Sequence, residues 1–266
     1  MRPANGALDP AANSHDPGTQ APGDVTWRMR IEEAFESAPG SNVEKLENFA
    51  KYVPRQTLAR FLTRYELFKL VQDVQGSIVE CGVLQGGGLM GFAQLSAILE
   101  PYNFQRRLFG FDTWTGFTSV SEQDLRGTQR KSGHLKPGGF AAPDSHADLL
   151  NWIDLYDQNR LLNHFPKVKL VRGDFAETSA RFLEEHPHVV ISLLYLDFDV
   201  YEPTRIALER FLPRVPKGGV VVFDELNEET FPGETIALLE KSGSLQGWRL
   251  RRFPFEPRIS YAVVGD

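Results

Sequence analysis

The sequence predicts an α/β fold in which helices cover both faces of a doubly wound, mostly parallel sheet of seven strands. Three observations predict it. Short apolar runs such as residues 193–196 show no polar alternation, as expected of strands buried on both faces of a parallel sheet. Several of these runs end in Asp or Glu and precede a helical pattern. A glycine-rich turn, residues 82–88, lies between one such run and a helix, which is the usual order of a βα unit.

Composition limits the classes of protein to which the chain could belong. Its 266 residues, 41% hydrophobic and 24% charged, suit one globular α/β domain with some extra segments. A net charge of −6 argues against a nucleic-acid partner, which usually requires a clustered basic surface. No apolar stretch reaches the length of a membrane span, and the first twenty residues lack the apolar run of a signal peptide. We therefore expect a cytoplasmic protein with no membrane partner.

The N-terminal part of the chain divides into two segments. Residues 1–24 are rich in Pro, Gly and Ala and are predicted to form a disordered leader, because they contain too little apolar surface to bury. Residues 25–75 are predicted to be helical, with apolar side chains at spacings of three and four after Pro54. Arg55, Arg60 and Arg64 on this last helix could face either a ligand or water. Residues 76–266 are expected to form the ligand-binding domain.

The first βα unit of that domain contains the glycine turn. Residues 77–81 form a β-branched strand, and a helical pattern follows the glycines until Pro101 ends it. Glycines at this point let a ligand approach the backbone and the amides of the helix N-terminus. The spacing G-x-x-x-G does not match the dinucleotide fingerprint G-x-G-x-x-G. The turn therefore suits a ligand other than a dinucleotide, or serves only as a tight turn.

The second and third strands, residues 108–111 and 168–171, are also followed by acids. Asp112 suits the two hydroxyls of a ribose, or caps a helix. Asp174 could accept a hydrogen bond from an exocyclic amine, or cap the helix predicted over residues 176–184. The long segment between these strands, residues 113–147, is rich in Gly, Ser, Pro and charge and is predicted to form an active-site lid.

The fourth and fifth strands, residues 193–196 and 220–223, are each followed by a pair of acidic residues. If the two strands are neighbours, Asp197, Asp199, Asp224 and Glu225 converge at the edge of the sheet where ligands bind. Four such carboxylates repel one another unless a hard cation such as Mg²⁺ lies among them, or unless some cap helices or pair with arginine. Residues 248–253 and 260–264 are predicted to pair as an antiparallel hairpin at the sheet edge.

The order of these motifs resembles that of class I S-adenosylmethionine-dependent methyltransferases, which have a Rossmann-like fold. The resemblance is carried by ECGVLQGGG, GFDTWTGF, VRGDF and the PKGG turn before VVVFDE. Within that class, LDFDVYEPT together with VVFDE resembles the macrocin O-methyltransferase family. Members of this family are metal-dependent enzymes that methylate sugar hydroxyls in bacterial natural-product pathways. The resemblance extends from about residue 52 to the C-terminus and implies a homodimer or higher homo-oligomer.

The resemblance also implies roles for individual residues. Asp199 would be the general base, and Asp197, Asp224 and Glu225 would ligate Mg²⁺. The family usually has Asp-Asp where this chain has Asp224-Glu225, and the segment EETFPGET, residues 228–235, also differs from the macrolide-sugar members. For S-adenosyl-L-methionine, the implied contacts come from Glu80, Cys81, Gly82, Gly86, Gly87, Gly88, Asp112, Thr113, Asp174, Phe175 and Asp197.

The expected function is Mg²⁺-dependent O-methyl transfer from S-adenosylmethionine to a hydroxyl of a deoxysugar, either nucleotide-linked or on a glycosylated natural product. Three alternatives remain open. The first is a metal-dependent methyltransferase of vicinal phenols, with Trp114 lining an apolar acceptor slot. The others are a non-catalytic cofactor-binding module and an NAD-dependent oxidoreductase, although the absence of G-x-G-x-x-G disfavours the oxidoreductase.

Overall fold

The computed structural model describes residues 22–127 and 132–266. Most of the predicted disordered leader, residues 1–21, therefore lies outside the described residues. The chain divides into two compact units, Met1–Leu58 and Ala59–Asp266. None of the helices in the described ranges combines the length and apolar character needed to cross a membrane.

The first unit is helical in its described part. Ser41 and Glu44 form a capping box at the start of its second helix, in which each side chain accepts a hydrogen bond from the other residue's backbone N–H. Lys45 donates to the carbonyl of Phe35 at 2.7 Å, which joins the first two helices. The helices of this unit are α1 (Pro22–Ser37), α2 (Asn42–Glu47), α3 (Phe49–Tyr52) and the first turn of α4 (Arg55–Leu70).

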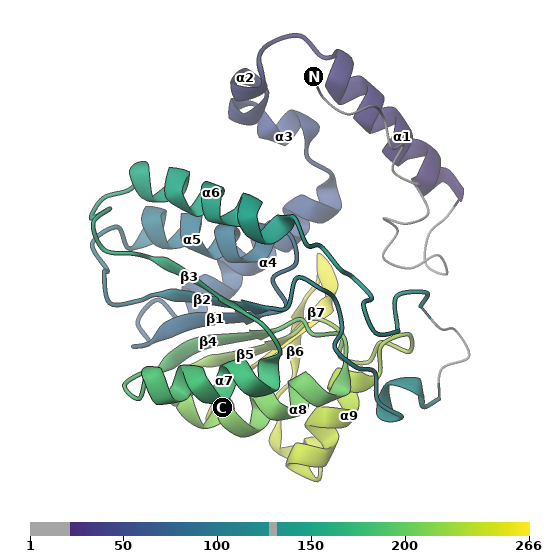
Figure 1. The fold of residues 1–266 in the computed structure, drawn as a ribbon, viewed down its shortest axis with the longest axis vertical. Helices are drawn as coiled ribbons and strands as arrows, with labels where there is room; N and C mark the ends of the chain where they lie inside the picture. Colours follow the sequence, from purple (N-terminus) through teal and green to yellow (C-terminus); the bar gives the residue numbers. More distant parts are fainter. Residues whose placement is uncertain (1–21, 128–131) are drawn as a thin grey trace. The chain divides into compact units, whose positions relative to one another are not determined.

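The second unit is organised around one seven-stranded sheet in the order β3-β2-β1-β4-β5-β7-β6, with strands β1 to β5 parallel (Figure 1). β7 runs antiparallel to β5 and pairs with β6, so the predicted terminal hairpin at the sheet edge is confirmed. The strands are β1 (Ser77–Cys81), β2 (Leu108–Asp112), β3 (Val168–Arg172), β4 (Ile191–Leu196), β5 (Val220–Phe223), β6 (Arg251–Phe253) and β7 (Glu256–Val263).

The strand order reverses direction between β1 and β4. The chain passes outward from β1 to β2 and β3 on one side, then returns to place β4 and β5 on the other side of β1. In open α/β sheets a ligand binds outside the carboxyl ends of the strands at such a switch point. The fold therefore brings the glycine turn after β1 and the acids after β4 and β5 to one region.

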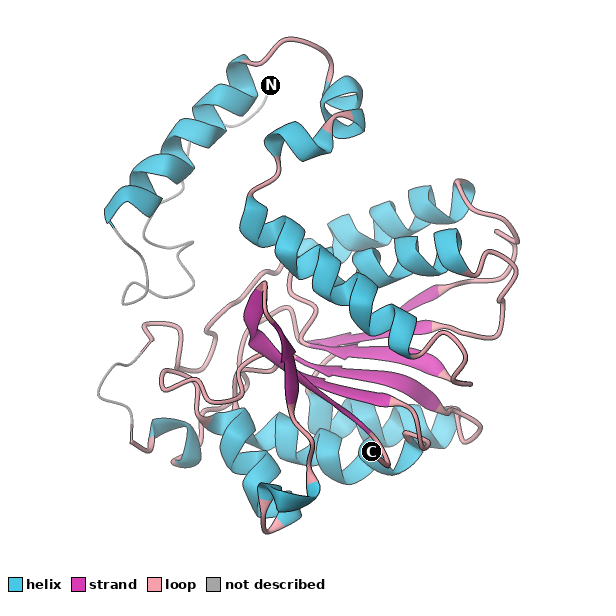
Figure 2. Ribbon diagram, turned by 180° about the vertical axis from the view of Figure 1, so that it is seen from behind, coloured by secondary structure: helices cyan, strands magenta, loops and turns pink. Residues whose placement is uncertain are grey.

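Helices cover both faces of the sheet, as predicted (Figures 1 and 2). α4, α5 and α6 pack on one face, and α7, α8 and α9 pack on the other. The helix bounds beyond α4 are α5 (Gly87–Leu99), α6 (Ser145–Gln158), α7 (Phe175–Glu185), α8 (Tyr201–Arg210) and α9 (Gly233–Ser242).

Alternate residues of each central strand face the two cores. Tyr195 points into the core beneath α4 and α5, whereas Leu194 and Leu196 face α8. All three side chains are fully buried. The unbroken apolar character of β4 thus arises because neither face of the strand meets water.

α9 is a helix for which the sequence provided no prediction. It begins at Gly233, within the segment EETFPGET. Pro232 and Gly233 precede the apolar side chains that pack on the sheet. Pro and Gly are typical of a loop, but Pro is also common at the start of a helix.

The predicted lid contains little regular structure. We call residues 113–144, between β2 and α6, the β2–α6 connection. Its described residues contain one short 3₁₀ turn, Gln123–Leu125. Its role as a lid stays a prediction.

Candidate active site

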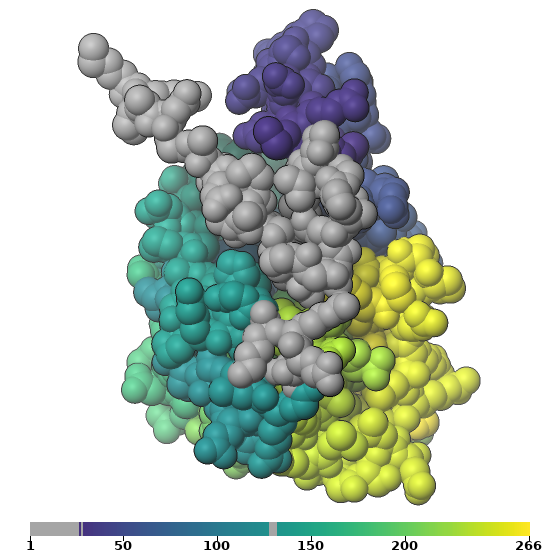
Figure 3. Space-filling view, turned by 90° about the vertical axis from the view of Figure 1, so that its right-hand side faces the viewer, coloured from purple at the N-terminus to yellow at the C-terminus, as the bar shows by residue number. Residues whose placement is uncertain are grey.

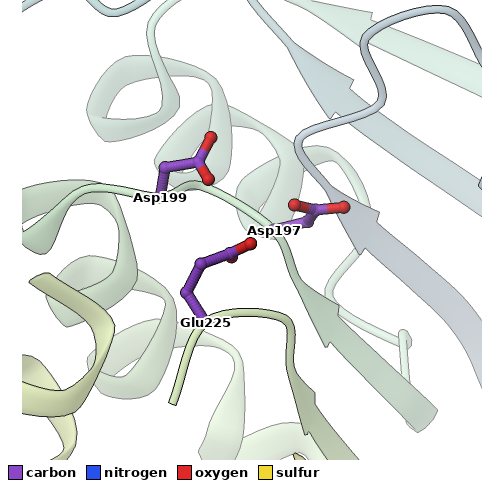
Figure 4. A group of neighbouring side chains, drawn as sticks. All are labelled: Asp197, Asp199 and Glu225. Atoms are coloured by element: carbon purple, nitrogen blue, oxygen red, sulfur yellow. The ribbon is translucent and has the colours of Figure 1, made fainter. Parts of the chain in front are cut away.

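Carboxylates from two neighbouring strands converge where the sequence predicted. β4 and β5 pair with Leu196 opposite Phe223, so the residues that follow each strand emerge side by side. Asp197, Asp199 and Glu225 each place one carboxylate oxygen within 4.8 Å of the others. Figure 4 shows the two aspartates on the segment after β4 and the glutamate on the segment after β5. We call these three residues the acid cluster.

Asp199 occupies a strained turn between β4 and α8. Its φ angle is +61°, in the left-handed region that residues with a Cβ rarely adopt. Such a conformation costs on the order of 1 kcal/mol or more and persists only where the surroundings enforce it. Burial and the nearby charge of Asp224 raise the pKa of Asp199 to about 7. A carboxylate with this property is suited to exchange a proton near neutral pH.

Asp224 lies beside the acid cluster but has other partners. Tyr195 donates its hydroxyl hydrogen to Oδ1 at 2.6 Å, and Arg60 donates from Nη2 to Oδ2 at 2.8 Å. Burial alone would raise the pKa of Asp224, but the Arg60 charge and the Tyr195 hydrogen bond lower it below its ordinary value. Arg60 therefore pairs with an acid of the site, a contact that the sequence analysis did not consider for it.

The acid cluster has the chemistry of a site for a hard cation. Burial together with the charges of neighbouring carboxylates raises the pKa values of Asp197 and Glu225 well above their ordinary range. Oε2 of Glu225 is buried and has no hydrogen-bond partner among the described residues. Arg258 approaches Oε1 of Glu225 only to 3.8 Å and is largely exposed. An oxygen-only donor set with an unpartnered buried oxygen fits a divalent cation such as Mg²⁺.

Glu234, in the first turn of α9, is a site residue that sequence reasoning missed. Its side chain is fully buried, and Oε2 accepts a hydrogen bond from the backbone N–H of Glu225 at 3.1 Å. Its Oε1 has no hydrogen-bond partner among the described residues, and burial raises its pKa well above the ordinary value. An acid just after Pro-Gly at a helix start was the available signal, but that pattern is also common on exposed helices.

The glycine turn is shaped by contacts with the carboxyl end of β4. Gly82 has a φ angle of +87°, and a Cβ at this position would lie 1.8 Å from the carbonyl oxygen of Asp197. Gly86, with a φ angle of +86°, precedes the first turn of α5. Only glycine therefore allows the turn after β1 to approach the segment that carries the acid cluster.

Asp112 holds this turn in place. Its Oδ2 accepts hydrogen bonds from the backbone N–H groups of Val83 and Leu84, at 2.8 and 2.7 Å, and its Oδ1 accepts from Trp114 N–H at 2.6 Å. Trp114 itself is only 1% exposed and donates from its indole to the carbonyl of Leu84. Its ring is therefore buried and does not line the open acceptor slot that the phenol alternative left possible for it.

A buried ion pair lies beneath the start of α5. Nη2 of Arg64 is 3.4 Å from Oε1 of Glu80, and a Cβ at Gly88 would lie 2.0 Å from that same oxygen. Burial raises the pKa of Glu80 to about 7, against the opposing charge of Arg64. Oε2 of Glu80 and Nε of Arg64 have no hydrogen-bond partner among the described residues. This pair offers unused polar atoms where the resemblance places the methionine part of the cofactor.

The other residues predicted to contact the cofactor have clear structural roles. Cys81 is buried in the core, and Thr113 donates to the carbonyl of Gly116. Asp174 accepts from the N–H of Ala176 at 2.8 Å, so it caps α7, as one of the two readings of this residue expected. The ring of Phe175 is buried among other phenylalanines.

The arginine on α8 that follows the acids after β4 has other partners. Arg205 pairs with Glu202 and Glu209 on its own helix. It therefore does not neutralise the acids after β4.

Comparison with known proteins identifies the family. The family model described as macrocin-O-methyltransferase (TylF) matches residues 63–235. A crystal structure of CalS11, described as a calicheamicin methyltransferase, superposes with a TM-score of 0.87 at 35% identity and covers 99% of each chain. The apo structure of CalS11 is described as a TDP-rhamnose 3'-O-methyltransferase. It has a TM-score of 0.79 at 33% identity and covers 93% of this chain and 96% of its own.

Two relatives from Streptomyces also match. The 8-demethyl-8-(2,3-dimethoxy-alpha-L-rhamnosyl)-tetracenomycin-C 4'-O-methyltransferase of Streptomyces olivaceus is 28% identical over 159 residues, which are 59% of this chain and 55% of that protein. The demethyldecarbamoylnovobiocin O-methyltransferase of Streptomyces niveus is 26% identical over 156 residues, 58% of this chain and 53% of that protein. The matched stretches thus span about half the length of these relatives.

The family model covers well over half of the chain, and the seven-stranded sheet with its C-terminal antiparallel strands is the class I methyltransferase fold that the sequence predicted. The chain belongs to the macrocin-O-methyltransferase (TylF) family of O-methyltransferase enzymes.

Proposed function

We propose that this protein transfers a methyl group from S-adenosylmethionine to a hydroxyl of a deoxysugar, with Mg²⁺ bound at the acid cluster. The deoxysugar is either nucleotide-linked or part of a glycosylated natural product. The observation that carries the proposal is the convergence of Asp197, Asp199 and Glu225 beside the glycine turn, in a chain of this family. The names of CalS11 and the tetracenomycin relative, which refer to rhamnose or a rhamnosyl group, support a sugar acceptor.

We assign the binding of S-adenosylmethionine to the turn after β1 and the ends of β2 and β3. The unpartnered Oε2 of Glu80 and the amides at the start of α5 are available to the charged methionine end of the cofactor. Asp112 anchors the turn through two hydrogen bonds on Oδ2, and its Oδ1 accepts one from the N–H of Trp114. Each carboxylate oxygen has two lone pairs, so Oδ1 retains capacity for a ribose hydroxyl.

The metal ligands follow from the same acids. Asp197 and Glu225 belong both to the set implied by the resemblance and to the acid cluster. We assign Asp224 as the third ligand, since Arg60 and Tyr195 donate to different oxygens and each carboxylate oxygen has two lone pairs. This leaves Asp199 as the general base. The close approach of Asp199 to the other two acids also supports an alternative arrangement. In this alternative, Asp199 instead of Asp224 is the third ligand of the cation.

Methyl transfer to a sugar requires that a weakly acidic hydroxyl lose its proton. A Mg²⁺ ion bound here would lower the pKa of a coordinated hydroxyl, and S-adenosylmethionine would supply the methyl group from its sulfonium. Asp199 lies in the same cluster and is suited to accept the hydroxyl proton. Its strained turn and buried neighbours fix its carboxylate in one place, which lowers the entropic cost of reaching the reactive geometry.

A panel of acceptors tests the proposal. The protein would be incubated with labelled S-adenosylmethionine and Mg²⁺, and with TDP-rhamnose, a rhamnosylated polyketide or catechol. We expect label in the sugar acceptors and little in catechol. Transfer to catechol alone would favour the phenol methyltransferase. Binding of S-adenosylmethionine without transfer to any acceptor of the panel would favour a non-catalytic module, and calorimetry that shows binding of NAD alone would overturn the assignment.

A further inference from the structure

Asp124, in the β2–α6 connection, is a buried acid for which the proposed reaction has no use. Its side chain is only 1% exposed. Oδ2 accepts hydrogen bonds from both the backbone N–H and the hydroxyl of Ser121, at 2.8 and 2.6 Å. Oδ1 accepts from the backbone N–H of Tyr201 at 2.6 Å, although the two residues are 77 positions apart in the sequence. The acid thus joins the connection to α8.

Tyr201 is the first residue of α8, and this helix has no side-chain cap of its own. Val200 occupies the N-cap position and cannot accept a hydrogen bond through its side chain. The first N–H groups of a helix need an acceptor from elsewhere, and a carboxylate there also interacts favourably with the helix dipole. Asp124 supplies this acceptor. The helix end that it fixes begins two residues after Asp199, the residue with the strained backbone.

The same carboxylate lies against the start of α9. A Cβ at Gly233 would lie 2.3 Å from Oδ1 of Asp124 and 2.4 Å from the nitrogen of Tyr201. Gly233 therefore allows α9, α8 and the connection to meet at one point. The next residue, Glu234, accepts the hydrogen bond from the N–H of Glu225. In Figure 3 the teal connection and the yellow-green C-terminal part lie side by side on the same face.

We propose that Asp124 is a positioning residue that couples the β2–α6 connection to the two turns that carry the acid cluster. It fixes Asp199 through the N-terminus of α8. It also stabilises the junction from which Glu234 holds Glu225. The β2–α6 connection and the acid cluster are then ordered together. The coupling of Asp124 to catalysis rests on the proposed function, whereas its control of the turn at Asp199 does not.

Three variants separate this role from a merely structural one. Asp124→Ala removes the acceptor for Tyr201 N–H. Asp124→Asn keeps one side-chain oxygen for that N–H but replaces the second acceptor by a donor. Ser121→Ala is the matched control, because it removes a hydroxyl that bonds to the same carboxylate and leaves the bond to Tyr201 intact.

The first measurement is hydrogen exchange in a peptide that covers residues 198–203, made on the whole protein without ligands. We expect exchange to be about tenfold faster in Asp124→Ala, as for the loss of an N-terminal capping contact, and close to wild type in Ser121→Ala and Asp124→Asn. Unchanged exchange in Asp124→Ala would overturn the proposal, whatever reaction the protein catalyses. Faster exchange across the whole sheet as well would show that Asp124 stabilises the fold in general, and this result would also overturn the proposal.

The second measurement links the turn to the site. Mn²⁺ binding is followed by calorimetry, and methyl transfer to TDP-rhamnose is followed with Mn²⁺ present. In Asp124→Ala we expect weaker Mn²⁺ binding and a fall in kcat of up to about a hundredfold, the effect of a small displacement of a catalytic group. S-adenosylhomocysteine affinity should stay at the wild-type value. Wild-type Mn²⁺ affinity and kcat in Asp124→Ala would contradict the coupling. Failure of wild-type protein to bind Mn²⁺ would instead contradict the proposed metal site, and the exchange measurement would still decide the positioning role.

Discussion

The three aspartates of this site differ in backbone conformation and in the groups that contact them. Asp197 continues the ladder of β4, since its N–H donates to the carbonyl of Cys81 at 2.8 Å. Asp199 lies in a left-handed turn and Asp224 is neutralised by Arg60. One acid is thus held by a strand, one by a strained turn and one by an ion pair. These differences give chemically identical groups different capacities to bind a proton or a cation.

Asp199→Asn tests the assignment of the general base. The amide is nearly the same size as the carboxylate but cannot accept a proton at neutral pH, so kcat should fall by about a hundredfold or more. The affinity for S-adenosylhomocysteine, measured by calorimetry, should stay within the error of the wild-type value. Mn²⁺ affinity distinguishes the two arrangements. It should persist in Asp199→Asn and fall in Asp224→Asn if Asp199 is the base, and the reverse result would make Asp199 the ligand.

Tyr195→Phe tests the hydrogen bond that orients Asp224. The substitution leaves one buried carboxylate oxygen without the donor now at 2.6 Å, so the free energy of unfolding should fall by about 1–3 kcal/mol. Tyr156→Phe is the matched control, because that buried hydroxyl donates to the carbonyl of Ala93 on α5. Both variants should lose stability in urea denaturation, but only Tyr195→Phe should alter Mn²⁺ affinity. Equal Mn²⁺ affinities in the two variants would contradict a role for Tyr195 in the metal site.

The secondary-structure elements were largely predictable because their local patterns agree with their final environment. The strands from β1 to β5 were predicted from short apolar runs; β1, β4 and β5 are buried along their whole length and β2 along all but its last residue, whereas β3 at the sheet edge is partly exposed. α9 was not predicted, because tertiary packing rather than local propensity makes a helix follow Pro232 and Gly233. The contact that fixes the start of α8 at Tyr201 was also not predicted. Its first amide is satisfied by Asp124, a distant residue that no local pattern reveals.

Gly82→Ala tests the close approach of the glycine turn to the segment after β4. The added Cβ would lie 1.8 Å from the carbonyl oxygen of Asp197, in a backbone conformation that alanine rarely adopts. We expect the free energy of unfolding to fall by about 1–3 kcal/mol or more, with weaker binding of S-adenosylhomocysteine. Gly87→Ala is the control, because no atom lies within 4 Å of its added Cβ. A Gly82→Ala protein as stable as Gly87→Ala would contradict this account of the turn.

At the scale of the whole molecule, the acids that meet in the site are far apart in the sequence. Their convergence could be predicted because parallel strands of a doubly wound sheet end at one edge. The pairing of Arg60 with Asp224 could not be predicted, since the residues are 164 positions apart and the contact depends on how α4 crosses the sheet. For the same reason the sequence indicated four acids without showing which three would form the acid cluster.

The buried acids predict how stability depends on pH. In the folded protein without metal, the pKa values of Asp199 and Glu80 are raised to about 7. The ordinary pKa values of these acids are about 4. Between about pH 4 and about pH 7, the folded state therefore holds protons that the unfolded chain has released. The metal-free protein should lose stability as pH rises through this window.

Calorimetric melting checks this dependence. With chelator present, the Tm should be lower at about pH 8 than at about pH 5.5, and Mg²⁺ should raise the Tm more at the higher pH, where the ligands are ionised. Asp199→Asn should reduce the pH dependence of the metal-free protein. A metal-free Tm that rises across this range would contradict the raised pKa values.

The most direct measurement is methyl transfer to TDP-rhamnose in protein stripped of metal with a chelator and then titrated with Mg²⁺. We predict that the stripped protein binds S-adenosylmethionine but transfers no methyl group, and that Mg²⁺ restores transfer in wild type but not in Asp197→Asn. Full transfer in excess chelator would contradict the central claim that the acids after β4 and β5 act by holding a metal ion.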